Sequence, residues 1–418
     1  MPSSSSLVIV GASHAGTQLA STARELGFDA PIVLLGDERH GPYQRPPLSK
    51  GLLADQTTVA QLALRGPEFY ARKGIDLRLG KRVEALDLDS GCVRLADGTP
   101  VDYGWLALTT GARCRMLQVP GSELLGVHVL RTLDDALAVQ KSLGRCRSAC
   151  IVGGGFIGLE VAGTLAAAGA RVCVIESQPR LLARAFPPFI SDYVAAAHRQ
   201  RGVTLELGRA VRALNGREGH VEGVLLDDGR VLNCDLVVIG IGVIPNMELA
   251  QAAGIACGDG ILVDALGRTS APNVLAAGDV ASMEGCPFRG TSSRTRLESI
   301  QAASDGARAA ASGLVGRPEP VSTVPWFWSD QHDLNFQMAG LAAPGDQTVV
   351  RGALASDRFT VFYLRGGIVA AAHSVNRPAE HMLARRLISR RARIHAEVLA
   401  DASADLKPFS IHPSADQI

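Results

Sequence analysis

Two stretches of the chain share one hydrophobic pattern: a short apolar run, a glycine-containing turn and a longer apolar segment with helical spacing. The first begins at residues 7–10 and the second at residues 149–152. Another apolar run follows each of them, at residues 31–35 and 171–175. An apolar run that leads through glycine into an apolar helix and then a second strand predicts a βαβ unit with buried parallel strands. The pattern therefore predicts an α/β protein that contains two such units.

The second turn has the complete glycine fingerprint of a dinucleotide-binding unit. In this turn Gly153 makes the tight bend, Gly155 lets the backbone approach a pyrophosphate, and Gly158 lets the helix pack on the strand. Glu176 follows 23 residues after Gly153, at the end of the next predicted strand. A carboxylate at that place accepts both ribose hydroxyls and repels a 2′-phosphate, so we expect NADH rather than NADPH.

The first turn departs from this fingerprint at one position. Gly11 and Gly16 are present, but Ser13 replaces the middle glycine. Serine is a small departure, so a pyrophosphate can still approach the backbone. Asp37 stands 26 residues after Gly11 and is our ribose-binding candidate, with Glu38 as the alternative.

The resemblance between the two stretches extends beyond the turns. Residues 74–83 match residues 202–211, and each match precedes a predicted hairpin with an Asp-Gly turn, at residues 97–98 and 228–229. The spacing between the copies falls from 142 residues at the turns to 128 at these segments, so the first copy has 14 additional residues between them. This insertion contains a proline-rich loop, residues 41–50, which we expect to be stiff and to present Ser49 and Lys50.

The remaining chain predicts a return to the first unit and then a third domain. Residues 273–280 predict a strand that ends at Asp279, a carboxylate that suits either dinucleotide hydroxyls or a helix N-cap. Residues 298–312 predict a helix. From about residue 315, alternating stretches predict strands, and residues 379–393 predict a basic closing helix. The alternating stretches are residues 334–339, 348–352, 360–364 and 368–372.

Composition and charge exclude several functions. A net charge of +1 provides no overall field for nucleic acid or a membrane surface. No apolar run approaches the roughly 20 residues of a membrane span, and the N-terminus lacks the basic segment of a signal peptide. The eight cysteines contain no C-x-x-C pair, so we expect small buried hydrophobes in a reducing cytoplasm and no metal site.

Five motifs resemble those of one known family. The chain is similar to the FAD-containing, NADH-dependent ferredoxin reductases of the putidaredoxin reductase type, which serve bacterial P450 and ring-hydroxylating dioxygenase systems. The resemblance covers essentially the whole chain. The motifs are PYQRPPLSK (42–50), GGGFIGLE (153–160), NVLAAGDV (273–280), RLESIQAA (296–303) and VPWFWSDQ (324–331).

The resemblance implies a fold and a domain division. It implies an α/β protein with two Rossmann-like dinucleotide-binding domains, arranged as in glutathione reductase, and a smaller C-terminal α+β domain. Residues 1–112 and 240–316 would form the FAD-binding domain, residues 113–239 the NADH-binding domain, and residues 317–418 the C-terminal domain.

The resemblance and the glycine turns together give a set of cofactor-binding candidates. The FAD candidates are Gly11, Ser13, His14, Ala15, Gly16, Asp37, Glu38, Arg45, Lys50, Val83, Thr110, Gly111, Arg131, Asp279, Ile300 and Trp328. The NADH candidates are Gly153, Gly155, Phe156, Ile157, Gly158, Glu176, Arg184 and Gly242.

Three residues are implied in catalysis. NADH would transfer a hydride to the flavin, Lys50 would stabilise the reduced ring, and Glu160 would hold Lys50 in place. Glu160 lies in the first part of its helix, so it could instead complement the helix dipole. Trp326 and Trp328 alternate in an extended segment, and we expect them on opposite faces, one against the flavin or nicotinamide and the other in the core. The family resemblance favours Trp328 for the flavin side.

The implied partner is a [2Fe–2S] ferredoxin that takes electrons singly and feeds an oxygenase. Such ferredoxins are usually acidic, so we expect transient docking on a basic patch, and a monomer or weak homodimer. Candidates for the patch are Arg289, Arg294 and Arg296, and Arg385, Arg386, Arg390, Arg391 and Arg393 on the closing helix.

The motifs are also compatible with two alternative functions. A rubredoxin could replace the ferredoxin, and the fold also occurs in redox-sensing flavoproteins of the apoptosis-inducing-factor type. Disulfide reductases, NADH oxidases and NADH peroxidases place cysteine on the loop that here carries Ser49 and Lys50, so these enzymes are excluded.

Overall fold

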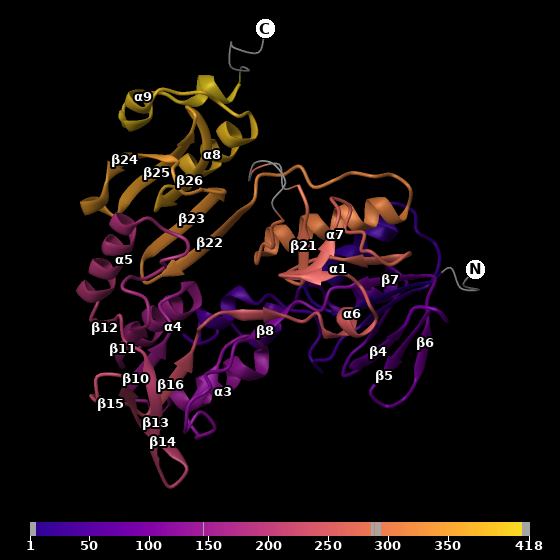
Figure 1. Ribbon diagram of the computed structural model, residues 1–418, viewed down its shortest axis with the longest axis horizontal. Helices are drawn as coiled ribbons and strands as arrows, with labels where there is room; N and C mark the ends of the chain where they lie inside the picture. The colour runs from indigo at the N-terminus through magenta and orange to yellow at the C-terminus, as the bar shows by residue number, and fades with distance from the viewer. Residues whose placement is uncertain (1–5, 145, 286–287, 289–293, 412–418) are drawn as a thin grey trace.

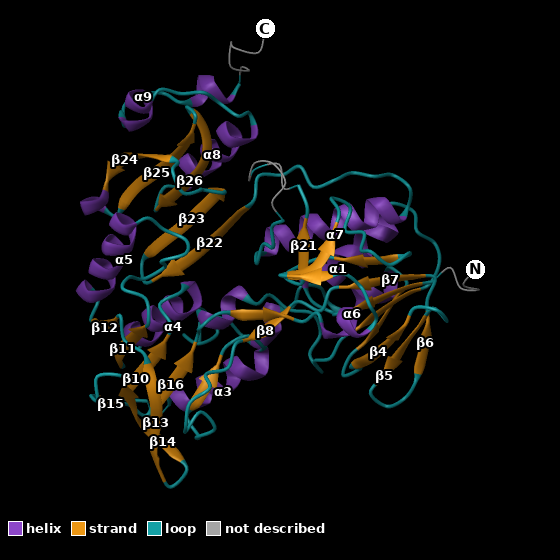
Figure 2. Cartoon of the chain, in the orientation of Figure 1, coloured by secondary structure: helices purple, strands orange, loops and turns teal. Residues whose placement is uncertain are grey.

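The computed structural model describes residues 6–144, 146–285, 288 and 294–411. Two α/β units follow each other along the chain, and an antiparallel sheet with its helices follows them (Figure 1). In Figure 2 helices lie against the sheets of all three parts. No described helix is long and apolar enough to cross a membrane.

The first unit is a five-stranded parallel sheet in the order β20-β7-β1-β2-β3. Strands β1 and β2 are apolar and buried throughout because both faces of the sheet are covered, whereas the edge strand β3 also contains Asp76 and Arg78. Leu7 and Ile9 pack with helices α1 and α7, whereas Val8 and Val10 pack against the antiparallel meander β4-β5-β6. The elements are β1 (Leu7–Val10), α1 (His14–Glu25), β2 (Ile32–Leu35), α2 (Pro67–Arg72), β3 (Ile75–Arg78), β4 (Val83–Asp87), β5 (Cys92–Leu95), β6 (Pro100–Asp102), β7 (Trp105–Leu108), β20 (Val274–Ala276) and α7 (Ile300–Leu314).

The second unit repeats this plan with the sheet order β12-β11-β10-β16-β9. Ile151 faces the helices, while Cys150 and Val152 face the meander β13-β14-β15. Both predicted Asp-Gly turns are present, with φ of +84° at Gly98 and +85° at Gly229. The elements are β9 (Val127–Val129), α3 (Leu133–Leu143), β10 (Ser148–Val152), α4 (Phe156–Ala167), β11 (Arg171–Glu176), α5 (Pro188–Gln200), β12 (Val203–Leu207), β13 (Val211–Arg217), β14 (His220–Leu226), β15 (Val231–Asn233) and β16 (Leu236–Ile239).

Two short antiparallel strands carry the chain between the units. Strand β8 (Ala112–Cys114) leaves the first unit and pairs with β17 (Val243–Pro245), which brings the chain back. After β17 come α6 (Glu248–Ala252), β18 (Cys257–Gly258), β19 (Gly260–Val263) and β21 (Ala281–Met283). Strand β20, which lies between β19 and β21 in the chain, completes the first sheet beside β7.

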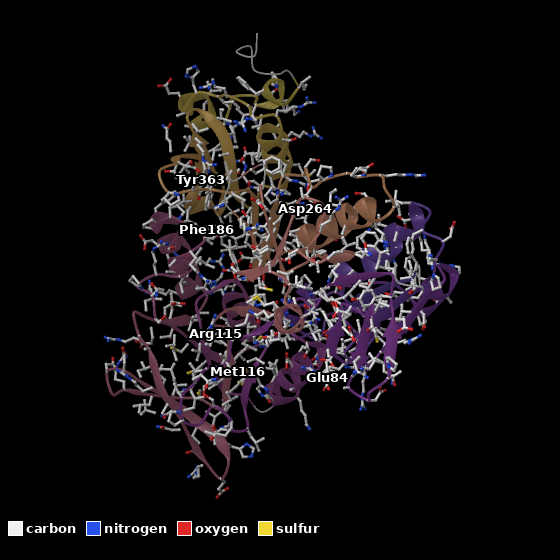
Figure 3. All side chains as sticks on the ribbon, turned by 45° about the vertical axis from the view of Figure 1, so that its right-hand side comes forward. Glu84, Arg115, Met116, Phe186, Asp264 and Tyr363 are labelled. Carbon is white, nitrogen blue, oxygen red and sulfur yellow. The ribbon has the colours of Figure 1, made fainter. Side chains whose placement is uncertain are left out.

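The C-terminal sheet is antiparallel, in the order β22-β23-β26-β25-β24. One face shares a hydrophobic core with α4 and α5 of the second unit, which includes Phe186 and Tyr363 (Figure 3). The Phe186 ring lies 6.1 Å from the Phe336 ring of this face, centroid to centroid. The other face packs against α8. The elements are β22 (Trp326–Gln331), β23 (Leu334–Gly340), β24 (Gln347–Ala353), β25 (Arg358–Arg365), β26 (Ile368–Val375), α8 (Pro378–Ser389) and α9 (Ala396–Ala400).

The closing helix is shorter than the sequence predicts. We expected it to reach residue 393, but α8 ends at Ser389 and Arg391 has a left-handed φ of +52°. The chain turns there because Ala392 and Ile394 are buried beside β26, where the Val369 amide donates to the Ala392 carbonyl. Tertiary burial therefore overrides the helical pattern.

Arg351 ties the last residues of the domain to its sheet. The side chain is 5% exposed, and its Nε lies 2.8 Å from Glu380 Oε1. The guanidinium also donates to the backbone carbonyls of Leu399, Asp401, Ala402 and Ala404. One buried cation thus organises the turn that follows α9.

We expect Arg351→Ala to lower the free energy of unfolding by about 3–5 kcal/mol, because it leaves several carbonyls without their donor and leaves the buried Glu380 carboxylate with Arg377 as its remaining cation. Urea unfolding measures this change. Arg358→Ala, at an exposed position of the same sheet, should shift it by less than about 0.5 kcal/mol. An equal effect of the two substitutions would contradict the structural role of Arg351.

Candidate functional site

The glycine turns of the two units have the same construction. A Cβ at Gly11 or Gly153 would clash with a carbonyl of the neighbouring strand end, Thr109 or Gly240, and both glycines have φ near +115°, at +116° and +113°. A Cβ on the third glycine of each turn, Gly16 or Gly158, would clash with the carbonyl of the first. These four positions require glycine because the backbone packs tightly around them.

The middle position of each turn is different. A Cβ at Gly155 would meet no atom within 4 Å, and Gly155 is the N-cap of α4. Ser13 is the N-cap of α1, and its side chain makes no capping hydrogen bond. Open space before the free amides of a helix N-terminus suits a phosphate. Ala15 is buried in the first turn of α1, while Phe156 and exposed Ile157 begin α4.

Glu176 lies where the fingerprint predicts an acid. It is the last residue of β11, and its Oε2 accepts from the Gly154 amide at 2.7 Å. Its Oε1 accepts from the Gln178 amide at 2.7 Å, so the carboxylate is fixed beside the turn. Arg184 is exposed and its guanidinium lies near Gly242, at the end of the strand beside β10. The NADH candidates therefore gather at one edge of the second sheet.

The two acidic candidates of the first unit lie in different surroundings. Asp37 is exposed and pairs with Arg82 at 2.9 Å. Glu38 is half-buried, accepts from the Tyr43 hydroxyl at 2.5 Å and pairs with Arg45 at 2.7 Å. The register of β2 places Gly36, not Asp37, at the position that Glu176 has in the second unit. Both acids remain candidates for binding the ribose of FAD, and Glu38 is the half-buried one, held by Tyr43 and Arg45.

A network of charges joins Glu38 to the end of β20. Arg45 donates to the Arg131 carbonyl at 2.6 Å, and the Arg131 guanidinium pairs with Asp279 at 2.6 Å. Burial, reinforced by the cations of Arg45 and Arg131, lowers the pKa of His14 to about 4, so its imidazole is neutral at pH 7. The network thus concentrates two guanidinium groups beside the first glycine turn.

The other FAD candidates lie around this network. Gly111 is close to the Arg131 guanidinium, Val83 begins β4, and Ile300 begins α7. Thr110 donates its hydroxyl to the Asn246 carbonyl at 2.6 Å, so this side chain already has a partner in the connection between the units. The sequence did not indicate that Tyr43, which lies within the proline-rich loop, would bind Glu38 at this site.

Lys50 and Glu160 form the predicted ion pair. Lys50 Nζ lies 2.9 Å from Glu160 Oε2, with side-chain exposures of 19% and 3%. The proline-rich segment forms the 3-10 turn η1 (Pro46–Ser49), which delivers Lys50 to α4 of the second unit. Because this pair is desolvated, its attraction is stronger than that of a surface ion pair. The alternative role of Glu160 toward the helix dipole required a place in the first turn of α4, and this placement is wrong, since Glu160 lies beyond the first turn, which contains no acidic residue.

Sequence reasoning missed two hydroxyl groups that also bind Glu160. Ser49 Oγ donates to Oε2 at 2.5 Å, and Ser329 Oγ of β22 donates to Oε1 at 2.7 Å. Both serines are buried. Glu160 therefore joins the proline-rich loop, the NADH-side helix and the C-terminal sheet. No local pattern indicates that either serine binds Glu160, since Glu160 lies more than 100 residues away from each of them in the sequence.

The prediction that Trp326 and Trp328 face opposite sides is wrong. Their rings stack with centroids 5.6 Å apart and an interplanar angle of 29°. Side chains two positions apart in a strand lie on the same face, and only Phe327 between them faces the other side, where it packs against Phe156. Both tryptophans are half-buried, so neither is a core residue.

The candidate docking arginines differ in their surroundings. Arg294 pairs with Glu284, and Arg296 pairs with Asp259 and Glu298. Arg385 lies 4.8 Å above the Trp326 ring, and Arg289 is outside the described residues. Four arginines are exposed around the end of α8: Arg386, Arg390, Arg391 and Arg393.

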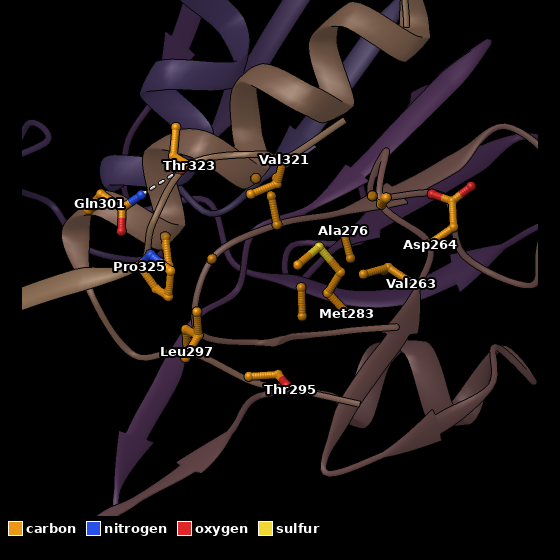
Figure 4. A pocket seen from close by; sticks show the side chains of 17 residues that line it. Val263, Asp264, Ala276, Met283, Thr295, Leu297, Gln301, Val321, Thr323 and Pro325 are labelled. Carbon is orange, nitrogen blue, oxygen red and sulfur yellow. Dashed lines mark hydrogen bonds between the residues drawn. The ribbon is translucent and has the colours of Figure 1, made fainter. Parts of the chain in front are cut away.

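A pocket adjoins the flavin-side candidates (Figure 4). It has a volume of about 650 Å³, including the open space at its mouth, and its walls are mainly apolar. Gly278 and Gln301 line it, each next to an FAD candidate, Asp279 and Ile300. The segment that includes Val321 and Thr323 runs along it before β22.

The residues present fit two dinucleotides. The second glycine turn has open space before the helix amides and a fixed carboxylate for a ribose, and the first has an N-cap serine whose side chain leaves the helix amides uncapped. The first is flanked by the guanidinium groups of Arg45 and Arg131, which suit a diphosphate. Among the described residues, no group of His, Cys, Asp and Glu could hold a metal ion.

Comparisons with known proteins agree with this geometry. Residues 5–307 match the family described as pyridine nucleotide-disulphide oxidoreductase, and residues 326–410 match the reductase C-terminal family. Rhodocoxin reductase of Rhodococcus erythropolis is 42% identical over 96% of this chain and 93% of its own. The ferredoxin–NAD(+) reductase component of the anthranilate 1,2-dioxygenase system of Burkholderia cepacia is 42% identical over 96% and 98%. The solved covalent putidaredoxin reductase–putidaredoxin complex matches with a TM-score of 0.95 and 36% identity, covering all of both chains.

We expect Glu176→Gln to reduce the preference for NADH over NADPH by about tenfold in kcat/KM, because the amide still accepts from Gly154 but no longer repels a 2′-phosphate. Steady-state rates with the two nucleotides measure the preference. Glu206→Gln, on the adjacent strand β12, removes a half-buried carboxylate that pairs with Arg230 and should leave the preference unchanged. An unaltered preference in Glu176→Gln would remove this residue from ribose recognition.

Proposed function

Since the chain belongs to the pyridine nucleotide-disulphide oxidoreductase family and ends in a reductase C-terminal domain, we propose that it passes electrons from NADH to a [2Fe–2S] ferredoxin that feeds an oxygenase. It is a flavoprotein oxidoreductase that uses FAD and NAD(H). The relatives' names, which include the ferredoxin–NAD(+) reductase component of a dioxygenase system, support the ferredoxin over a rubredoxin and the enzyme over a redox sensor.

The observation that carries the proposal is the Lys50–Glu160 ion pair. Related flavoenzymes that reduce disulfides need cysteine on the loop before this lysine, and the loop here presents Ser49 instead. A lysine held by a buried carboxylate offers a fixed positive charge and no thiol chemistry. The site is therefore suited to receive a hydride and to pass electrons onward rather than to cleave a disulfide.

We assign the two nucleotides by the division of the chain. FAD would bind residues 1–112 and 240–316, NADH residues 113–239, and residues 317–418 would form the C-terminal domain. The return of β20 to the first sheet supports the discontinuous FAD domain. FAD, when bound, would accept the hydride and release electrons singly. Lys50 would supply positive charge beside it, Glu160 would hold Lys50, and Trp328 would cover the ring from β22.

We propose an acidic, transiently bound ferredoxin. The exposed arginines at the end of α8 have no ion pair among the described residues, whereas Arg294 and Arg296 are already paired with carboxylates. Long-range attraction of this kind raises association rates more than it raises affinity, which suits a shuttling carrier. A cytoplasmic monomer or weak homodimer completes the proposal, and the described cysteines are all free, as in a reducing compartment.

Purified protein should show flavin absorption bands, and it should reduce cytochrome c with NADH only slowly until a [2Fe–2S] ferredoxin is added. The rate with ferredoxin should rise at least tenfold, since the carrier provides the single-electron path. Absence of flavin would overturn the proposal, and stimulation by rubredoxin but by no ferredoxin would favour the rubredoxin reductase. Moderate salt should slow the ferredoxin-dependent rate and leave direct reduction of the flavin by NADH unchanged.

We expect Lys50→Met to slow reduction of the bound flavin by NADH about 100-fold, because the site loses its fixed positive charge and Glu160 loses its cation. Stopped-flow absorbance at saturating NADH measures this step. Lys73→Met, which removes a surface lysine paired with Glu25 in the same unit, should have no effect. An unchanged rate in Lys50→Met would remove Lys50 from the mechanism.

A further inference from the structure

A buried chain of hydrogen bonds extends from Glu160 into the C-terminal domain. Gln331 Nε2 lies 3.2 Å from Ser329 Oγ, and Gln331 Oε1 lies 3.0 Å from His198 Nε2. His198 Nδ1 in turn lies 3.3 Å from His332 Nε2. Ser329, Gln331 and His198 are all 0% exposed. The proposed mechanism assigns no role to these residues.

The carboxylate determines the direction of every bond in this chain. An ionised carboxylate only accepts, so the single Ser329 hydroxyl hydrogen is used on Glu160. Ser329 Oγ must then accept from the Gln331 amide nitrogen, which leaves the Gln331 carbonyl to accept from His198 Nε2–H. His198 is consequently the Nε2–H tautomer and its Nδ1 accepts from His332.

The surroundings of His198 and His332 keep the hydrogen-bond chain in this order of donors and acceptors. Burial lowers the pKa of His198 to about 4, so the ring stays neutral at pH 7. Gly163 lets α4 approach the turn of the C-terminal sheet closely, since a Cβ there would lie 2.9 Å from the His332 amide nitrogen. His332 has a left-handed φ of +56°, which places its ring against His198 with centroids 4.8 Å apart.

The chain and the proline-rich loop bind opposite oxygens of one carboxylate. Oε1 accepts from Ser329, and Oε2 accepts from Ser49 and Lys50. With Oε1 fixed from the C-terminal domain, the side chain cannot rotate without breaking a buried hydrogen bond to a charged group. Thr164, one turn further along α4, donates to the Ser49 carbonyl at 3.0 Å and fixes the loop itself.

From this arrangement we propose that Ser329, Gln331 and His198 are positioning residues: a one-directional hydrogen-bond chain, from the C-terminal domain through Glu160, that sets the position of the Lys50 ammonium. The inference deepens the proposed function and rests on it only for the effect on hydride transfer. The positioning of Lys50 involves only side chains of this protein, so it can be tested without an electron acceptor.

The test compares Ser329→Ala with Ser374→Ala in the purified full chain. Ser374 is a matched control because its hydroxyl is also buried in the C-terminal sheet. It accepts from Thr360 and takes no part in the hydrogen-bond chain to Glu160. Reductive methylation followed by mass spectrometry reports how firmly Lys50 is held, with Lys73 and Lys81 as internal references. Stopped-flow reduction of the bound flavin by NADH reports the consequence for the reaction.

In Ser329→Ala we expect methylation of Lys50 roughly three- to tenfold faster, flavin reduction slower by a similar factor, and Lys73 and Lys81 unchanged. Ser329→Thr, which keeps the hydroxyl, should restore both rates, and Ser374→Ala should alter neither. A role limited to stability would change all lysines together. Equal Lys50 methylation in the Ser329→Ala and Ser374→Ala proteins would overturn the proposal.

Nitrogen NMR of histidine-labelled protein gives an independent result if Ser329→Ala does not fold. His198 of the unsubstituted protein should carry its proton on Nε2 at neutral pH, and Gln331→Leu should release this preference. A proton on Nδ1, or a charged His198 ring, would break the order of donors and overturn the proposal. Neither NMR outcome depends on whether a ferredoxin accepts electrons, so failure here is distinguishable from failure of the proposed function.

Discussion

The carboxylate of Glu160 is the constraint on which the arrangement of the three parts depends. It is 3% exposed and accepts from Lys50, Ser49 and Ser329, which come from the proline-rich loop and from β22. Removing such a charge from water is costly, and only its partners make it tolerable. Three segments distant in the sequence must therefore meet correctly before this one residue can be buried.

The two α/β units share one architecture but differ in the residues that surround their glycine turns. Their glycine turns are built alike, down to the carbonyls that exclude a side chain at the first and third glycines. The difference lies in the extra residues of the first copy, which form the loop that leads to Lys50. The copies also treat their acids differently, since Glu176 is fixed by backbone amides and Glu38 by the side chains of Tyr43 and Arg45.

Sequence reasoning predicted what depends on local periodicity and on the chemistry of short motifs. Both βαβ units, both Asp-Gly turns and the three-part α/β fold are confirmed, because burial on two faces and positive φ leave clear patterns. The Lys50–Glu160 contact was predicted from the family resemblance and is present.

The failures have physical causes. The tryptophans were placed on opposite faces although a strand repeats every two residues, and the closing helix was extended past the point where Ala392 and Ile394 become buried. The contacts of Ser49 and Ser329 with Glu160, and of His198 with Gln331, could not be predicted, since only the folded chain brings these partners together. The return of β20 to the first sheet has a consequence for biosynthesis. The edge of β7 stays unpaired from residue 108 until residue 274 is made, roughly 10–30 s at ordinary translation rates, while the whole second sheet can already form. An apolar strand edge that is open for that time can pair with neighbouring nascent chains, so the late synthesis of β20 exposes the first unit to mispairing.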